Sequence, residues 1–498
     1  MLDLIIKGAA VIDGSGSVGT ILDVALKGDR IVSIAPNIEA ESTEALDATG
    51  LVLSPGFIDV HSHDDFHVLI EPEVRHNILQ GITTVIVGNC GFGAAGSDAG
   101  KIQMRAINEP SADLPDWAGY AGYLEEVDKT SPALNVAALI GHHTARREAM
   151  GGVADRPPSD SELAGMLANV TEGMEAGAVG LSTGLVYEPG RYASTEEVVA
   201  LSKVVGKHGG LYVSHMRDEG SGLLDSVRET LHIGEASGTA VEISHHKSVG
   251  KTNWGMVTQS LEMIEEAIAQ GRDVTADQYP YTARSTMLFA LVQNGTFNDS
   301  EGGAMGKSEP SEVLLCSVPG HEDFEGRTLQ SFVDEFDLPG EEAANKLLRD
   351  YSDSILVAAF GMDEGDVRMV MAHSSTMIGT DGLDRGSKPH PRAWGTYPRV
   401  LGKYVREEGV ISLENAIYKM THMPAAKFGI ANRGLVKEGY FADLVLFDPD
   451  TVIDRATYEN SRIGPSGMPH VIVNGKFAVK NGEHAGSRSG RALRRGQV

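Results

Sequence analysis

The most informative stretch of this chain is Gly56-Phe-Ile-Asp-Val-His-Ser-His-Asp64. Its apolar first half, residues 56–60, predicts a buried β-strand that ends in His61 and His63. Residues two apart on a strand project from the same face, so both imidazoles can contact one metal ion, with Zn–N bonds of about 2.0–2.1 Å. Pairs of histidines at this spacing also occur as ordinary core or surface residues. Further candidate ligands elsewhere in the chain are therefore needed to support a metal site.

Seven further segments resemble this strand, and helix-like stretches lie between them. This alternation is the pattern of βα units, and eight of them predict a (β/α)8 barrel. Helices are expected over 160–175, 195–207, 222–236 and 258–270, each with a polar cap or a terminal glycine. The expected inner strands are residues 56–60, 83–87, 135–140, 178–182, 211–214, 240–244, 273–277 and 377–380.

Both ends of the chain differ from this middle, because they consist of short β-rich runs between turn residues. Near the C-terminus, Asn474-Gly475 is a strong hairpin signal. We therefore expect an α/β protein, a TIM barrel with a small β-sandwich domain built from both termini. The expected strands at the two ends are residues 4–6, 10–12, 21–27, 30–34, 443–447, 470–473 and 477–479.

The domain boundaries follow from these patterns. Residues 1–54 and 434–485 are expected to form the small β domain, and residues 55–433 the barrel. The gap between the seventh and eighth strands is too long for a plain connection, so we expect an inserted lid over about residues 286–350. The final residues, 486–498, contain a basic, glycine-rich stretch that we interpret as a solvated tail.

The composition narrows the possible partners and the compartment. A net charge of -27 argues against nucleic acid or an anionic membrane and favours a small-molecule substrate. Any carboxylate of that substrate must therefore meet a local cluster of cations. Two cysteines give no disulfide framework, and the chain has neither a signal-peptide pattern nor an apolar run of about 20 residues. We expect a cytoplasmic enzyme; its oligomeric state stays open.

Three further polar residues end predicted inner strands. His215 and His245 follow the strands at 211–214 and 240–244, and Asp381 follows the last strand. Barrel enzymes carry their chemistry at this end of the strands. A carboxylate beside a metal can take a proton from water and return it to a leaving group. Asp381-Gly382 is also a common turn dipeptide, so a plain loop is the alternative interpretation.

Together these residues resemble the amidohydrolase superfamily, and within it the N-acyl-D-amino-acid deacylase (D-aminoacylase) family. The resemblance covers nearly the whole chain. It is carried by Val87-Gly-Asn-Cys-Gly-Phe92, by Ser244-His-His-Lys247 with Trp254, and by His390-Pro-Arg-Ala-Trp-Gly395. These motifs are much more specific than the histidine pair. The resemblance implies zinc-dependent hydrolysis of a linear amide to a carboxylate and a free D-amino acid.

The resemblance also implies the metal ligands. Many binuclear amidohydrolases use a lysine at the end of strand four, but this chain has no lysine between Lys129 and Lys203. The family uses a cysteine after strand two instead, and Cys90 occupies that position. By resemblance, Cys90, His215 and His245 hold one tight zinc, and His61 and His63 serve a second, weaker site. A buried structural cysteine is the alternative.

On the substrate side, the resemblance places the substrate carboxylate against a set of cations and hydroxyls, and a tyrosine near the scissile amide. Arginine can grip a carboxylate with two parallel hydrogen bonds, and lysine supplies a point charge. No Lys or Arg lies between Arg284 and Lys307, so we expect hydrophobic D-residues, with D-glutamate or D-aspartate as the alternative. The implied carboxylate-binding residues are Lys247, Tyr279, Ser285 and Arg392, and the tyrosine is Tyr187.

In the expected mechanism, Asp381 takes a proton from the attacking water and passes it to the departing amine. Two rival functions are a cyclic amidase such as a hydantoinase, which would need the missing lysine, and a non-catalytic relative of the same barrel. The acyl chain and the occupancy of the second metal site stay open. Four further residues, His142, His143, Asp64 and Asp65, are equally consistent with roles behind the ligands and with purely structural roles.

Overall fold

The structure is a computed structural model, which describes residues 1–94, 101, 114–297 and 303–496. Its largest unit is a parallel barrel of eight strands in the order β6, β7, β8, β9, β10, β11, β12, β16. All eight inner strands predicted from the sequence are present, with ends shifted by at most two residues. Their bounds are β6 Phe57–Asp59, β7 Ile82–Val87, β8 Asn135–Gly141, β9 Gly180–Gly184, β10 Leu211–His215, β11 Ala240–Ile243, β12 Val274–Gln278 and β16 Thr376–Ile378.

The barrel closes between its first and last strands just beyond their ends. Ser62 forms a parallel bridge with Gly382, and the Asp381 backbone N–H donates to the His61 carbonyl at 2.7 Å. On the outside, the buried Tyr397 hydroxyl lies 2.9 Å from the carbonyls of both Ile58 and Ile378. One hydroxyl therefore ties β6 to β16, and the same closure brings His61 and Asp381 together.

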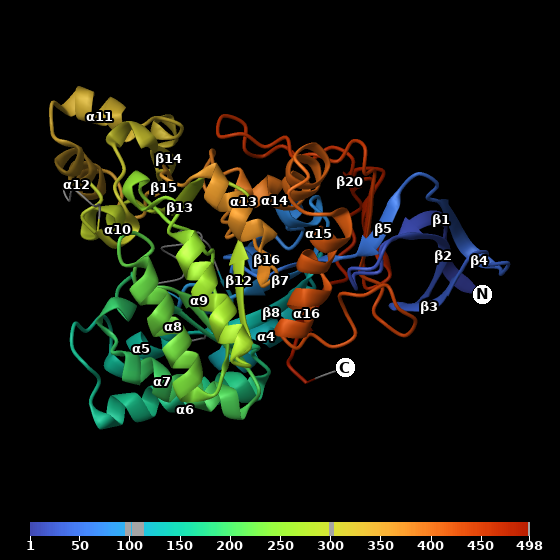
Figure 1. The fold of residues 1–498 in the computed structure, drawn as a ribbon, viewed down its shortest axis with the longest axis horizontal. Helices are drawn as coiled ribbons and strands as arrows, with labels where there is room; N and C mark the ends of the chain where they lie inside the picture. The colour runs from blue at the N-terminus through green and yellow to red at the C-terminus, as the bar shows by residue number, and fades with distance from the viewer. Residues whose placement is uncertain (95–100, 102–113, 298–302, 497–498) are drawn as a thin grey trace.

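Helices cover the outside of the barrel (Figure 1). The four helices predicted from the sequence are confirmed within one residue: α6 Asp160–Ala176, α7 Thr195–Lys207, α8 Leu223–Ser237 and α9 Val257–Ala269. Because helices cover the outer face and side chains fill the inside, the strands are buried on both faces and read as continuous apolar runs. The other barrel helices include α4 Gly119–Thr130, α5 His142–Met150, α13 Glu364–Ala372, α14 Arg392–Arg399, α15 Leu413–Met420 and α16 His422–Lys427.

The two ends of the chain form a nine-stranded mixed sheet, in the order β20, β19, β18, β17, β5, β1, β2, β3, with β4 beside β1. The prediction of one small β unit from both termini is confirmed. Asn474 and Gly475 have φ angles of 47° and 76°, which two-residue hairpin turns require. The bounds are β1 Leu2–Val11, β2 Thr20–Lys27, β3 Arg30–Ala35, β4 Ser42–Asp47, β5 Val52–Pro55, β17 Leu444–Phe447, β18 His470–Val473, β19 Lys476–Lys480 and β20 Glu483–His484.

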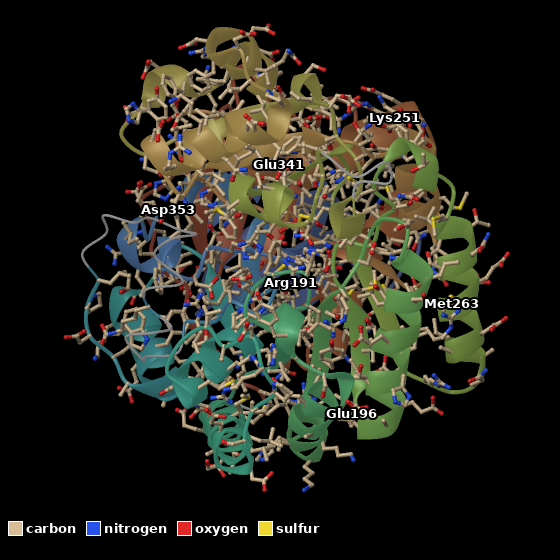
Figure 2. All side chains as sticks on the ribbon, turned by 90° about the vertical axis from the view of Figure 1, so that its left-hand side faces the viewer. Arg191, Glu196, Lys251, Met263, Glu341 and Asp353 are labelled. Atoms are coloured by element: carbon tan, nitrogen blue, oxygen red, sulfur yellow. The ribbon has the colours of Figure 1, made fainter. Side chains whose placement is uncertain are left out.

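An insertion separates β12 from β16, as the sequence predicts, and it is longer than expected at both ends. It holds an antiparallel sheet in the order β13, β15, β14 and its own apolar cluster. Figure 2 shows Glu341 and Asp353 of the insertion above Arg191 and Glu196 of the barrel. Gly302, a glycine of the expected lid, lies outside the described residues. The bounds are β13 Ala283–Met287, α10 Leu288–Gln293, β14 Val313–Ser317, α11 Leu329–Phe336, α12 Gly340–Asp350 and β15 Leu356–Phe360.

The basic stretch near the C-terminus is not the solvated tail that the sequence suggests. Strand β21 (Ala492–Leu493) pairs with β8, and Arg494 Nη2 lies 2.8 Å from Asp128 Oδ2. The reason lies in β9, which pairs with β8 only from Leu139 onward and leaves the first half of β8 open on that side. The tail satisfies these backbone groups. Across the described residues, no helix has the length and apolar character needed to cross a membrane.

Candidate metal centre

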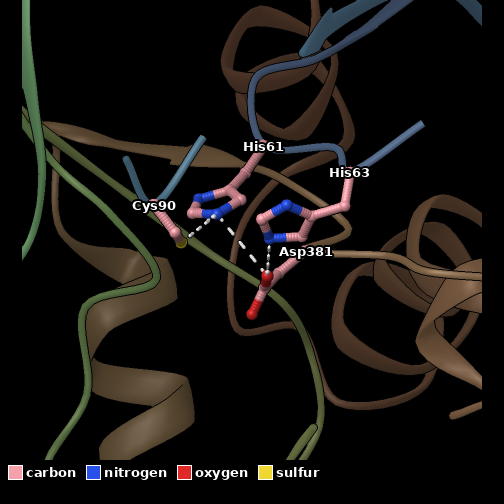
Figure 3. A group of neighbouring side chains, drawn as sticks. All are labelled: His61, His63, Cys90 and Asp381. Carbon is pink, nitrogen blue, oxygen red and sulfur yellow. Dashed lines mark hydrogen bonds and ion pairs between the residues drawn. The ribbon is translucent and has the colours of Figure 1, made fainter. Parts of the chain in front are cut away.

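The candidate ligands meet at one end of the barrel and come from the ends of four strands. His61 and His63 follow β6, Cys90 follows β7, His215 ends β10 and His245 follows β11. All five side chains are buried. Figure 3 shows His61, His63 and Cys90 pointing toward one another, with Asp381 beside them. The convergence expected from the sequence is therefore present.

The ligand atoms form two groups that share one sulfur. Cys90, His215 and His245 make one group, and His61, His63, Cys90 and Asp381 make the other. Within each group, the candidate ligand atoms lie within 4.8 Å of one another. Cys90 is therefore placed to bridge two metal positions.

The first group fits zinc in spacing and in chemistry. Cys90 Sγ lies 3.5 Å from His215 Nδ1 and 3.7 Å from His245 Nε2. Bond lengths of about 2.3 Å to sulfur and 2.0–2.1 Å to nitrogen put tetrahedral S and N ligands about 3.5 Å apart. The two ring nitrogens are 2.7 Å apart, which is a hydrogen-bond distance and closer than two ligands of one ion. A thiolate with two imidazoles is a good donor set for zinc.

The surroundings favour the thiolate form of Cys90. Burial alone would raise the pKa of its thiol, but the neighbouring His61 and His215 outweigh burial and hold the pKa well below its ordinary value. The thiolate is the form of cysteine that binds metal. Cys316, the other cysteine, is buried in the insertion, where desolvation raises its pKa to about 12.

Two carboxylates orient the ligands from behind, and the sequence analysis missed both. Asp277 Oδ2 lies 3.1 Å from His61 Nδ1, and Asp277 Oδ1 accepts from the His245 backbone N–H at 2.8 Å. Glu219 Oε1 lies 2.9 Å from His245 Nδ1. Both rings thus turn Nε2 toward Cys90. Asp277 ends a predicted inner strand and could have been found by that signal; Glu219, in the loop after β10, carries no such signal.

Replacing Asp277 with asparagine is expected to weaken zinc binding and kcat/KM by about 10- to 100-fold, the usual cost of losing a carboxylate behind a ligand. The amide keeps the size of the side chain but offers only one oxygen to the two groups that Asp277 now holds. Zinc titration against a competing chelator measures the effect. Asp273→Asn, at an exposed carboxylate four residues earlier that pairs with Lys427, is the control. Unchanged zinc affinity in Asp277→Asn would contradict the orienting role.

Asp381 lies between the second ligand group and a buried arginine. Its Oδ1 is 3.1 Å from His63 Nε2, and its Oδ2 is 2.9 Å from Arg392 Nη1. Burial would raise the pKa of Asp381, but Arg392 and His61 outweigh it and hold the pKa well below its ordinary value. The group is therefore a carboxylate, the form that can accept a proton.

Three residues of the centre have a backbone conformation that is rare for them. Cys90, His245 and Asp381 have φ angles of 55°, 34° and 47°. Positive φ costs a residue with a Cβ roughly 1–2 kcal/mol, and such residues gather at functional sites. Here the turn after each strand aims the side chain back over the barrel end. No residue pattern in the sequence reveals this strain.

A cavity of about 270 Å³ opens next to the ligands. Two of its cations are near an acid or an aromatic ring: Lys247 Nζ is 2.7 Å from Glu219 Oε1, and the Arg392 guanidinium lies 4.5 Å from the Tyr279 ring centre. Every residue that the resemblance implies around the substrate lines this cavity, namely Lys247, Tyr279, Ser285, Arg392 and Tyr187.

The insertion supplies one wall of the cavity. Most of this wall is apolar, with Met287, Phe289, Met305 and Leu356 among its residues. Arg284 lies in the same wall, and the sequence argument for hydrophobic substrates did not consider it, because that argument began after this residue.

The four residues left open by the sequence do not join the ligands. His142 pairs with Glu197 at 2.8 Å, and His143 Nε2 lies 2.9 Å from the Gly184 carbonyl. Asp64 pairs with His76 at 3.0 Å. These three therefore have structural partners.

Asp65 differs from these three, because its buried carboxylate oxygens have no hydrogen-bond partner; burial raises the pKa of Asp65 to about 7.

A separate cluster, His67 with His76 and Asp384, also has atoms close enough for a metal ion. Asp384 is held there by Arg462 at 2.9 Å and by the Trp394 indole at 3.1 Å, so this cluster is explained by its protein partners.

Comparison with known proteins gives close relatives over the full chain. A model described as the Amidohydrolase family matches residues 44–300 and 367–479. The chain is 39% identical to a D-aminoacylase of Alcaligenes xylosoxydans xylosoxydans, over 99% of this chain and 98% of that protein. It is 38% identical to an N-acyl-D-glutamate deacylase of the same organism, over 99% and 97%.

A solved structure agrees with these sequence matches. It is an N-acyl-D-glutamate deacylase from Bordetella bronchiseptica, complexed with zinc and a phosphonate inhibitor that mimics the tetrahedral intermediate of the reaction. It superposes with a TM-score of 0.89 at 35% identity, covering 99% of both chains. The relatives thus include a D-aminoacylase and two N-acyl-D-glutamate deacylases, and their sequence identities to this chain are similar.

Proposed function

The chain belongs to the amidohydrolase family and, within it, to the D-aminoacylase family, and from this membership we propose that it hydrolyses N-acyl-D-amino acids to a carboxylate and the free D-amino acid. The observation that carries the proposal is one thiolate, Cys90, within 3.7 Å of ring nitrogens from three histidines, at the mouth of a cavity that also holds Asp381. A cyclic amidase is disfavoured, since β9 ends at Gly184 without a lysine.

We assign the tight zinc to Cys90, His215 and His245. Their donor set and S···N spacing support this choice. A second, weaker site would use His61 and His63 with the same sulfur. An ion there would receive less of the thiolate charge, because Cys90 also serves the first site. When bound, zinc polarises the acyl carbonyl and lowers the pKa of water toward about 7.

The residues of this chain have three tasks in the reaction. Asp381 accepts a proton from the attacking water and delivers it to the nitrogen of the departing amine. Arg392, Lys247, Ser285 and Tyr279 bind the α-carboxylate of the substrate, so that the amide is held beside Asp381. Tyr187 donates a hydrogen bond to the oxygen that becomes negative. In the free protein, its hydroxyl lies 3.2 Å from Thr286 Oγ1.

The catalytic unit is the barrel, residues 55–433, with the insertion as one wall of its pocket. The small β unit, residues 1–54 and 434–485, contributes none of the residues assigned here.

Two classes of D-residue fit the pocket. The apolar wall of the insertion supports hydrophobic side chains, as expected from the sequence. Arg284 in the same wall supports acidic side chains.

The direct test is hydrolysis of paired enantiomers by the purified protein. N-acetyl-D-methionine, -leucine, -phenylalanine and -glutamate are compared with their L-forms, with and without a chelator. We expect acetate and free D-amino acid from at least one D-substrate and none from the L-forms. Chelation should stop the reaction, and added zinc should restore it. Equal rates for D- and L-substrates, or hydrolysis of a hydantoin in place of all of them, would contradict the proposal.

A further inference from the structure

Arg284 is a buried cation that forms no ion pair with any residue of the described part of the chain. Its side chain is 4% exposed, and its Nε and Nη1 have no hydrogen-bond partner. Its remaining nitrogen, Nη2, donates to the Ser308 hydroxyl at 3.3 Å. Among the residues that the structure describes, none supplies Arg284 with an acid within 4.0 Å.

Each of the other cations that line the cavity has an acid partner or is partly exposed to solvent. Lys247 pairs with Glu219, and Arg392 with Asp381, at 2.7 and 2.9 Å. Arg147 is partly exposed, so water can solvate it. A guanidinium keeps its charge in a protein, and a buried charge with no counter-charge is costly. Arg284 therefore differs from its neighbours in that it lacks the anion that would stabilise it.

Small residues flank this guanidinium. Opposite Arg284, on the neighbouring strand β15, stands the small residue Ala359. Beyond it, a Cβ added at Gly361 would come 3.2 Å from Nη1. The arginine therefore has small residues beside it, and it is one of the residues that line the same cavity as the ligand groups.

The position of Arg284 relates it to the carboxylate end of the substrate. It directly precedes Ser285 in β13, and both line the cavity with Tyr279 and Arg392. Arg284 therefore shares its cavity with all four residues that we assign to the α-carboxylate. A second carboxylate attached near the α-carbon lies on this side of the substrate.

We infer that Arg284 binds the side-chain carboxylate of an acidic D-residue, so that N-acyl derivatives of D-glutamate or D-aspartate are the preferred substrates. This inference rests on the proposed function and selects between its two substrate classes. It reverses the hydrophobic preference expected from the sequence. A guanidinium forms charge-assisted hydrogen bonds with a carboxylate, and Nε and Nη1 of Arg284 have no hydrogen-bond partner among the described residues.

The unmodified protein tests the inference with substrates of equal shape. We expect kcat/KM for the better of N-acetyl-D-glutamate and N-acetyl-D-aspartate to exceed that for its neutral amide, N-acetyl-D-glutamine or N-acetyl-D-asparagine, by about 10- to 100-fold, because a charge-assisted contact is lost. It should also exceed that for N-acetyl-D-methionine. N-succinyl-D-methionine puts the second carboxylate on the acyl group; if it is the best substrate, the side-chain assignment is overturned.

Variants add an independent test. Arg284→Met should lose about 10- to 100-fold in kcat/KM for the acidic substrate and little for N-acetyl-D-methionine. Arg284→Lys should retain part of the acidic preference, and Arg349→Met, at the exposed end of α12, should change neither. If D-methionine is released faster by the unmodified protein and Arg284→Met lowers both rates equally, the inference fails while the function stands. No hydrolysis of any N-acyl-D-amino acid would overturn both.

Discussion

Replacing Cys90 with alanine is expected to remove bound zinc and to lower kcat/KM by more than about 100-fold, the upper cost of losing only an outer partner of a ligand. The reason is that its sulfur belongs to both candidate ligand groups, with contacts of 3.3, 3.5 and 3.7 Å to His61, His215 and His245. Metal analysis of the purified variant, beside steady-state kinetics, measures both effects.

The chain offers a matched control, because it has only one other cysteine. Cys316 is equally buried, but it packs into the apolar cluster of the insertion. Cys316→Ala should keep its zinc and its kcat/KM. If Cys90→Ala binds as much zinc as the unmodified protein, the sulfur is not a ligand and the assignment of the tight site is wrong.

Replacing Asp381 with asparagine is expected to lower kcat by about 10²- to 10⁴-fold, the range that a positioned general base supplies. Zinc at Cys90, His215 and His245 should remain, because Asp381 contacts only the second group, through His61 and His63. Asparagine keeps the shape beside Arg392 and cannot accept a proton. Zinc content and kcat, measured on the same preparation, separate a catalytic role from a ligand role.

Asp384→Asn is the control for this variant, since Asp384 is a nearby carboxylate that Trp394 and Arg462 bind instead. It should change kcat far less than Asp381→Asn. Near-normal turnover in Asp381→Asn would contradict proton transfer by this residue. Loss of the tight zinc together with the activity would contradict the view that Asp381 stands outside that site.

The sharing of Cys90 has a consequence for the two metal positions. Were both positions filled, one thiolate would serve two ions and give each of them less charge, so the second ion would compete with the first for the same donor. The sequence supports this view only through family resemblance, whereas the structure adds that both ligand groups contain the same sulfur.

Much of the fold could be predicted because short segments of the sequence specify its strands and helices. Each inner strand is a short apolar run, and each long helix has a cap such as Ser159, whose side chain and Glu162 form a capping box at the start of α6. The candidate metal ligands could also be predicted, since the functional residues of barrels stand at strand ends and strand ends are local features.

Other features depend on contacts between distant residues. Glu219 gains its role only when its loop packs against His245 and Lys247. The C-terminal tail is ordered because β9 leaves half of β8 unpaired, which its basic composition does not indicate. The positive φ angles at Cys90, His245 and Asp381 arise where turns are fixed by the closed barrel.

The sequence by itself therefore determined the class of fold, the family and the candidate donor residues, because periodicity and strand-end residues are properties of short segments. Only the tertiary structure decided which charged side chains form ion pairs and which do not. Arg284 looks like any other arginine in the sequence, and only the packing of β13 shows that it is buried beside Ala359 and Gly361 with no acid of the described residues paired to it. Charge pairing is a matter of distance in space, and distance in space is fixed by the fold.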